Sequence, residues 1–227
     1  MSVVSSRDRV LVALRHQEPD RVPIDLGGMR SSGIQGIAYN RLKAHLGIGD
    51  GQTLMYDIMQ QLAQPEMSIV ERFHLDVVPL PRAVIGLDPL RPRWKPWTLP
   101  DGSPALVPDG LEQLPREDGG FEIRDDAGQL LYRMPAGGLY YEPVHHPLAD
   151  ATTVAEIEAW EPPSITDLEL AWLAAEARQL RASTDKAIMG LTGINLYERA
   201  QTARGWQRFM EDLAGQPVLA EALLRRL

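Results

Sequence analysis

Three short apolar stretches, separated by segments with helical spacing, constrain the fold of this 227-residue chain most strongly. They lie near residues 22, 76 and 188 and read RVPIDL, LDVVPLP and KAIMGLTG. Strands that alternate with helices of ten or more residues are typical of βαβ units and a parallel sheet. The sequence therefore predicts an α/β fold.

Capping residues and apolar spacing predict the helices around these strands. Ser5 or Ser6 can cap a first helix, which carries Leu11 and Leu14 on one face and ends before Pro19. Further helices are expected over residues 33–47, 54–65, 65–74, 154–160, 167–183, 195–205, 205–215 and 217–227.

Residues 81–150 differ from the rest because helical spacing stops and prolines and glycines are dense. The stretch GFEIRDDAGQLLYRMP predicts a β-hairpin with its turn at 126–128, and GLYYEPV predicts a third strand. We expect an antiparallel β-rich insertion within a single domain that spans 1–227. A closed eight-stranded barrel typically takes ~250 residues, so the chain is expected to form only part of one.

Charge and composition narrow the classes of partner. The net charge is −8 and the isoelectric point is about 5.2, which disfavours non-specific binding to nucleic acid or anionic lipid. There are no cysteines, so disulfides and thiolate metal sites are excluded. Arg7, Asp8 and Arg9 interrupt the apolar pattern of a signal peptide, and no apolar run approaches ~18 residues. We therefore expect a cytoplasmic protein with no nucleic-acid or membrane partner.

The stretch EPDRVPIDLGGMR contains the first group of candidate site residues. Gly27 and Gly28 follow a predicted strand, where they either form a tight turn or let a ligand approach the backbone. Arg30 either binds a carboxylate or is a solvated loop residue. Asp25 is either a hydrogen-bonded anchor of the turn or an acid of the site, and the pattern slightly favours the anchor.

The second and third predicted strands supply the remaining candidates. Asp76 either caps the junction between helix and strand, the more common case, or is a hydrogen-bonded carboxylate that binds N–H groups or moves a proton. Tyr197 and Glu198 follow the strand near 188, and Glu198 also suits the first turn of a helix. His145 and His146 are adjacent and point to opposite faces of an extended chain, so we expect no metal site there.

The N-terminal stretch RDRVLVALRHQEPDRVPIDLGGMRSSG resembles the signature of the uroporphyrinogen decarboxylase superfamily. This superfamily contains the decarboxylases of haem synthesis and cobalamin-linked methyltransferases. ERFHLDVVPLP, HHPLADATTVAEIEAWEPP and ERAQTARGWQRFMEDLAGQPVLAEALL resemble later family segments in the same order. The resemblance implies a TIM-type (β/α)8 barrel with its cleft at the C-terminal ends of the strands. The chain resembles the first half to two-thirds of that barrel.

Two departures from the decarboxylase pattern bear on the subfamily. The arginine-rich stretch that grips substrate carboxylates is replaced by GGMRSSG, which has the single arginine Arg30. No aspartate follows LDVVPLP until Asp88. The turn LGGMR approaches the PGGMM-like turn of the methyltransferase branch, although the zinc ligands of that branch lie in a C-terminal half that this sequence does not contain.

The resemblance thus implies a corrinoid-linked methyltransferase-like protein, with a corrinoid as substrate or partner cofactor. Its implied catalytic residues are Asp25 and Asp76, and its substrate-binding residues are Gly27, Gly28, Arg30, Tyr197 and Glu198. One alternative is a uroporphyrinogen decarboxylase that acts on a tetrapyrrole. Another is an inert barrel fragment that needs a C-terminal partner chain or a homo-oligomer.

Overall fold

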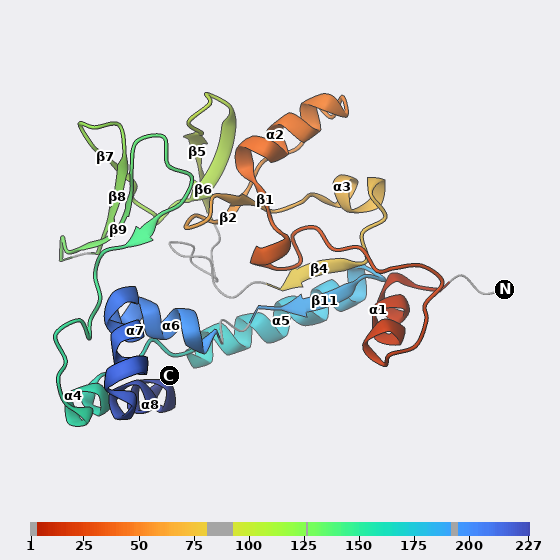
Figure 1. Ribbon diagram of the computed structural model, residues 1–227. Coiled ribbons are helices and arrows are strands. Elements are labelled where there is room, and N and C mark those ends of the chain that lie inside the picture. Colours follow the sequence, from red (N-terminus) through yellow and green to blue (C-terminus); the bar gives the residue numbers. More distant parts are fainter. Residues whose placement is uncertain (1–3, 81–92, 126, 192–194) are drawn as a thin grey trace. The chain divides into compact units, whose positions relative to one another are not determined.

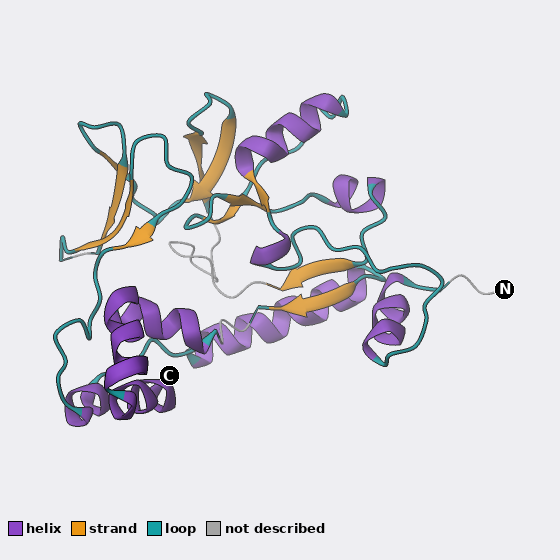
Figure 2. Cartoon of the chain, in the orientation of Figure 1, coloured by secondary structure: helices purple, strands orange, loops and turns teal. Residues whose placement is uncertain are grey.

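The computed structural model describes residues 4–80, 93–125, 127–191 and 195–227 (Figure 1). The chain forms two compact units, each assembled from separate stretches of sequence. Unit 1 comprises 1–113, 137–141 and 167–192, and unit 2 comprises 114–136, 142–166 and 193–227. Both contain helices and short strands (Figure 2), and no sheet in the described residues closes into a barrel. The predicted α/β class is confirmed at this level.

Unit 1 contains a parallel pair of strands. β4 (Val77–Leu80) and β11 (Ala187–Gly190) are far apart in sequence but lie side by side (Figure 1). Helix α5 (Asp167–Ser183) precedes β11 and packs against both strands. The apolar runs therefore predict these two strands correctly, because each is short, mostly apolar and covered by a helix.

The third predicted strand, RVPIDL, is extended but is not part of a ladder. The backbone N–H of Asp76 donates to the Ile24 carbonyl at 2.8 Å, whereas the Ile24 N–H donates to the Asp76 carboxylate at 2.9 Å. Pro23 has no N–H to donate. Leu26 packs against the buried cluster of Val70, Leu75 and Val78, so the segment lies against the parallel pair without regular pairing.

Helix α1 (Ser6–Leu14) buries a polar face. Ser5 caps it as expected, because its hydroxyl accepts from the Asp8 N–H at 3.1 Å. Leu14 is 71% exposed and Leu11 is also exposed, whereas Arg9 is buried. The helix is thus held by a buried charge rather than by the apolar face that its sequence suggests.

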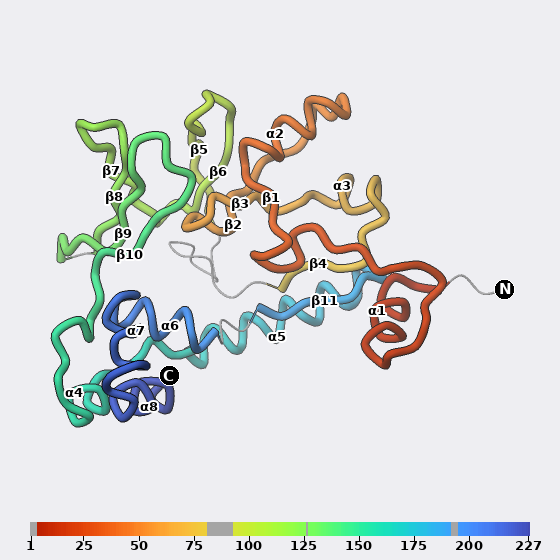
Figure 3. The backbone as a smooth tube through the Cα atoms, in the orientation of Figure 1, coloured from red at the N-terminus to blue at the C-terminus, as the bar shows by residue number. Residues whose placement is uncertain are grey.

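The helix predicted over 54–65 is wrong, because this stretch forms a β-hairpin. β2 (Met55–Asp57) and β3 (Leu62–Ala63) pair antiparallel, and β1 (Ile34–Gln35) joins β3 in a three-stranded sheet (Figure 3). Gln61 adopts a φ of 55° at the end of the turn. Because β1 uses the residues before it, helix α2 begins later than predicted, at Gly36, and runs to His45.

The remaining elements of unit 1 are short. β5 and β6 form an antiparallel hairpin, and α3 precedes β4. Their bounds are η1 Arg30–Ser32, a 3-10 turn, α3 Met67–Arg72, β5 Trp94–Thr98 and β6 Pro104–Pro108.

A small antiparallel sheet belongs to unit 2. β8 (Phe121–Arg124) and β9 (Leu130–Met134) form the predicted hairpin, although Asp126 in its turn lies outside the described residues. β10 (Glu142–Pro143) supplies the predicted third strand, and β7 (Leu114–Pro115) adds a fourth on the other side. Of the predicted insertion over 81–150, residues 81–92 lie outside the described part, and its strands are divided between the two units.

Four helices form the apolar core of unit 2. Phe209 is fully buried at its centre, and Arg204 and Asp212 form a buried ion pair at 2.7 Å. The helices are α4 Val154–Ala159, α6 Leu196–Arg204, α7 Trp206–Gly215 and α8 Pro217–Arg226. No helix in the described ranges has both the length and the apolar content needed to cross a membrane.

We expect Phe209→Ala to destabilise unit 2 by about 3–5 kcal/mol, because it leaves a cavity in the centre of the helical core. Trp206→Ala on the same helix should change stability by less than about 0.5 kcal/mol, because Trp206 is 64% exposed. Urea unfolding combined with hydrogen exchange of residues 196–227 measures both effects. Equal effects of the two substitutions would contradict the assigned core.

Candidate functional site

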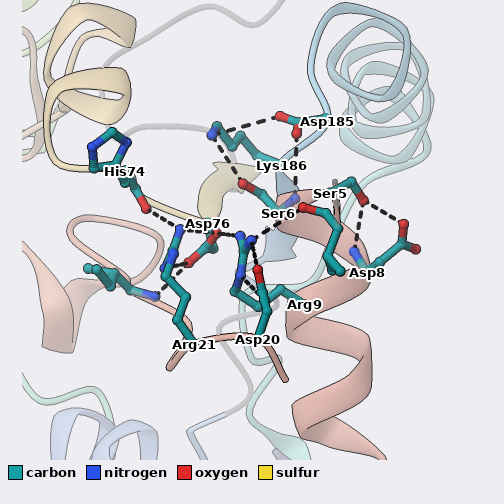
Figure 4. A network of polar contacts seen from close by, with 12 residues as sticks. Ser5, Ser6, Asp8, Arg9, Asp20, Arg21, His74, Asp76, Asp185 and Lys186 are labelled. Atoms are coloured by element: carbon teal, nitrogen blue, oxygen red, sulfur yellow. Dashed lines mark hydrogen bonds and ion pairs between the residues drawn. The ribbon is translucent and has the colours of Figure 1, made fainter. Parts of the chain in front are cut away.

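Asp76 is the centre of a buried ion network that joins three segments of unit 1 (Figure 4). Arg9 Nη1 donates to its Oδ1 at 2.6 Å, and Arg21 Nη1 donates to its Oδ2 at 2.6 Å. Arg9 also makes two 2.7 Å hydrogen bonds to Asp20. The carboxylate of Asp76 is thus fully hydrogen bonded within the protein.

The electrostatics of Asp76 suit a permanent anion. Burial alone would raise the pKa of its carboxyl, but hydrogen bonds from Arg21, the Ile24 N–H and Arg9 outweigh burial and lower the pKa to about 2. The residue precedes β4, so it lies at the N-terminal end of the parallel pair. Barrel enzymes build their sites at the opposite end. The geometry therefore explains Asp76 as a structural residue that holds the ion network together. A catalytic role for Asp76 stays a prediction.

Asp25 anchors the turn that follows the extended segment. Its Oδ1 accepts from the Gly28 N–H at 2.8 Å, and its Oδ2 accepts from the Ser32 hydroxyl at 2.6 Å. The Gly27 N–H donates to the Ser32 carbonyl at 2.8 Å and closes the same loop. The geometry of Asp25 is therefore that of the anchor, with both oxygens used inside the turn.

Close packing explains why both positions of the turn are glycine. Gly27 has a φ of 82°, and a Cβ added there would lie 2.7 Å from Pro65. A Cβ on Gly28 would lie 2.5 Å from the Asp25 carboxylate and 2.7 Å from Val77. The turn thus packs closely onto β4, and ligand binding by the two glycines stays a prediction.

Arg30 and Asp57 form an ion pair between the 3-10 turn η1 and the end of β2. Arg30 Nε contacts Asp57 Oδ2, but this oxygen receives no hydrogen bond from any described residue. The Arg30 side chain is 58% exposed, whereas that of Asp57 is 1% exposed. The Gln60 N–H holds the other carboxylate oxygen of Asp57 at 2.9 Å. The buried carboxylate of Asp57 therefore pairs with the exposed guanidinium of Arg30.

Tyr56 adds a buried phenol to this cluster. Its hydroxyl has no hydrogen-bond partner among the residues that the structure describes. Burial raises the pKa of this phenol, the charges of Asp57 and Asp25 add to the rise, and the charge of Arg30 opposes it, with a net pKa of about 12. Tyr56 is thus a protonated donor within the electrostatic reach of all three charges.

We call Asp25, Arg30, Tyr56 and Asp57 the turn cluster. It contains one positive and two negative formal charges, so it is not an anion-attracting surface. Two buried polar atoms in it, Tyr56 Oη and Asp57 Oδ2, have unused hydrogen-bonding capacity. Buried polar groups are normally satisfied, so this cluster is the candidate site that the geometry of unit 1 favours.

Tyr197 and Glu198 belong to unit 2, so their predicted place in a shared cleft with the turn stays a prediction. The Tyr197 hydroxyl contacts Met210 Sδ at 3.3 Å, and its ring packs edge-on against Phe209 at 5.7 Å. Glu198 lies in the first turn of α6, where the Asn195 side chain caps its N–H. Both residues thus have local roles in the helical core and its capping.

His145 and His146 contact different partners. Nδ1 of His145 lies 3.0 Å from Gln129 Nε2, and Nδ1 of His146 lies 2.8 Å from the Thr202 carbonyl. In the described parts of the chain, no group of three or more histidine or acidic side chains could hold a metal ion.

The sequence pattern does not single out Tyr56 and Asp57, because it predicts a helix over their stretch. The available signal was Asp57 three residues before Gln60, a spacing at which aspartate commonly caps a turn. The ion pair between Arg30 and Asp57 depends on how the β2–β3 hairpin packs beside the glycine turn. No local sequence pattern specifies that packing.

We expect Asp76→Asn to destabilise the protein by about 3–5 kcal/mol, because it leaves two guanidinium groups without their shared anion. Asp185→Asn is the matched control: its side chain is 60% exposed and pairs with Lys186 at 3.7 Å, and asparagine can still accept the 3.4 Å hydrogen bond from the Ser6 N–H, so it should cost less than about 1 kcal/mol. In wild type, Asp76 has a pKa below the ordinary 3.8, so its contribution of about 2 kcal/mol is complete above that pH. The contribution should be lost as the pH falls from about 4 to 2. Urea titrations across this range measure both effects, and an acid limb unchanged in Asp76→Asn would refute the assignment.

Tyr56→Phe should leave the melting temperature unchanged or raise it, because it removes a buried hydroxyl that has no partner. Tyr141→Phe is the matched comparison, because the Tyr141 hydroxyl donates to Gln113 Oε1 at 2.8 Å in a buried site. That substitution should cost about 1–3 kcal/mol. Thermal melts of the two variants decide the point. A larger loss for Tyr56→Phe would show that its hydroxyl is bonded.

Comparison with known proteins does not place the chain in a family. No family model, no curated protein and no solved structure matches it. The likeness to the uroporphyrinogen decarboxylase superfamily therefore rests on the sequence stretches quoted above.

Proposed function

We propose that this chain is a corrinoid-linked, methyltransferase-like member of the uroporphyrinogen decarboxylase superfamily, built on part of a TIM-type (β/α)8 barrel. The sheet of unit 1 supports the fold part of the proposal. The extended segment 21–26 lies beside β4 without regular pairing, and β4 pairs with β11, so the three stretches are neighbours in chain order, as the first strands of a barrel are. Helix α5 covers the pair, as an outer helix would.

The observation that carries the functional proposal is the neutralisation of Arg30 by buried Asp57. A decarboxylase acting on a tetrapyrrole with many carboxylates needs a surplus of cations where those carboxylates bind. The turn cluster has no surplus, because Asp57 and Asp25 outnumber its single arginine. A corrin ring carries mostly uncharged carboxamides around its rim, so its binding does not require such a surplus.

The remaining donors of Arg30 define how the turn would contact a ligand. No described residue accepts a hydrogen bond from Arg30 Nη1 or Nη2, and the side chain is more than half exposed. Its Nε edge faces Asp57, so the Nη edge is left for a ligand carbonyl. One or two such hydrogen bonds to the rim of a flat ring would orient it over the turn.

When bound, a corrinoid supplies a cobalt centre that accepts and donates a methyl group. The residues of this chain would bind and orient the ring: Arg30 donates to a rim carbonyl, and Asp25 holds the shape of the turn. Tyr56, whose pKa of about 12 keeps it protonated, would stay a neutral donor throughout. Gly27, Gly28, Tyr197 and Glu198 are retained as proposed binding residues, and Asp25 and Asp76 as the proposed acids, on the family likeness alone.

Equilibrium dialysis of the full chain against cobinamide, with uroporphyrin as the competing polycarboxylate, tests the proposal. Both ligands are coloured, so bound ligand is read directly from visible absorbance. We expect cobinamide to bind more tightly than uroporphyrin. A preference for uroporphyrin would favour the decarboxylase alternative, and binding of neither by folded protein would favour the inert fragment.

Arg30→Met should weaken cobinamide binding roughly ten-fold, because a charge-assisted hydrogen bond to the ligand is lost while the apolar stem remains. Arg41→Met is the matched control, since Arg41 is 74% exposed in the same unit and pairs only loosely with Asp101 at 3.7 Å. It should change binding less than about two-fold. Circular dichroism establishes that both variants are folded. An equal loss in the two variants would remove Arg30 from the site.

A further inference from the structure

We infer that Asp57 determines ligand specificity at the turn cluster, because its buried carboxylate cancels the charge of Arg30 and so rejects ligands rich in carboxylates. The inference deepens the proposed function and rests on it for the identity of the preferred ligand. It concerns a residue for which the sequence analysis assigned no role.

The position of Asp57 fixes its carboxylate within the site. The carboxylate is 1% exposed and one oxygen is held by the Gln60 N–H at 2.9 Å, so it cannot turn toward solvent without losing that bond. Residue 57 is also the last residue of β2, whose three residues are all buried. The anion is therefore fixed by the hairpin, independently of whether Arg30 has a ligand.

The burial of Asp57 makes its charge effective at the surface. Water screens an exposed carboxylate strongly, but a buried one acts through a medium of lower dielectric constant and loses less of its field. An approaching ligand carboxylate would thus feel Arg30 and Asp57 together, as a dipole of little net charge. Asp25 adds a second negative charge nearby, since the charges of both aspartates act on Tyr56.

The geometry still permits one contact to an uncharged acceptor. Arg30 Nε faces Asp57, which orients the guanidinium and leaves the two Nη groups for a ligand carbonyl. Asp57 thus has two effects with opposite consequences for different ligands. It fixes the donor edge, which helps a carboxamide, and it removes the attraction that a polycarboxylate would need.

Asp57→Asn removes the negative charge but keeps the shape of the side chain, and asparagine can still accept from the Gln60 N–H. The two effects of Asp57 can then be told apart by comparing a polycarboxylate with a carboxamide ligand. We expect the affinity for uroporphyrin to rise roughly ten-fold at low salt and the gain to shrink at high salt. Cobinamide affinity should stay the same or fall up to about three-fold, because Arg30 loses its orienting partner. Equilibrium dialysis at two ionic strengths measures all four affinities.

Asp109→Asn is the matched control for net charge. Asp109 is 49% exposed and lies 3.8 Å from Arg93 in the same unit. Its substitution changes the net charge of the protein by the same amount as Asp57→Asn and leaves the turn cluster intact. Its uroporphyrin affinity should stay within about two-fold of wild type. The double variant Arg30→Met/Asp57→Asn should lose the gain, because the released charge is that of Arg30. Should Asp57→Asn fail to fold, Asp57→Ser removes the same charge and is read in the same way.

The outcomes separate this inference from the proposed function. Weak cobinamide binding by wild type overturns the proposed function, but a uroporphyrin gain in Asp57→Asn would still support the role of Asp57. Uroporphyrin affinity that does not rise in Asp57→Asn overturns the inference, whatever cobinamide does. A gain of equal size in Asp109→Asn, or one that persists without Arg30, overturns it as well.

Discussion

The shared hydrogen bonding of Asp76 to Arg9 and Arg21 is the interaction on which unit 1 depends. It joins helix α1, the segment at 20–24 and the start of β4 through one buried carboxylate. A buried ion cluster of this kind stabilises only when every member is satisfied, since an unpaired buried charge is costly. Apolar contacts alone would not fix α1, because its leucines are exposed and Arg9 is buried.

The same interaction sets the position of the candidate site. Asp76 accepts a hydrogen bond from the Ile24 N–H, and the residues that follow, Asp25 and the two glycines, shape the loop that leads to Arg30. That loop delivers Arg30 to Asp57 on the hairpin. The buried network and the turn cluster are thus consecutive parts of one arrangement, in which the first fixes the backbone and the second presents the charge.

Short sequence patterns predicted the elements that neighbouring residues along the chain specify. β4, β11, the β8–β9 hairpin and the cap of α1 agree with expectation, because apolar runs, turn residues and a serine specify them. The β2–β3 hairpin was missed because its pairing with β1 comes from distant residues and overrides a weak helical pattern. Asp57 was missed with it. The sequence indicated Arg30 and Asp25 as candidate residues, but it did not indicate the negative charge that Asp57 places beside Arg30.

The interleaving of the two units constrains how the chain can reach its fold. Unit 1 includes residues 167–192, and the Arg7 N–H of its α1 donates to the Asp185 carbonyl, just before β11 begins. During synthesis, the first unit therefore cannot complete its parallel pair until residue 190 has emerged, by which time two segments of unit 2 already exist. Closing so long a loop is entropically costly and slows folding. Neither unit can be cut out as one continuous piece, so dissecting the protein requires rejoining segments in a new order rather than truncation.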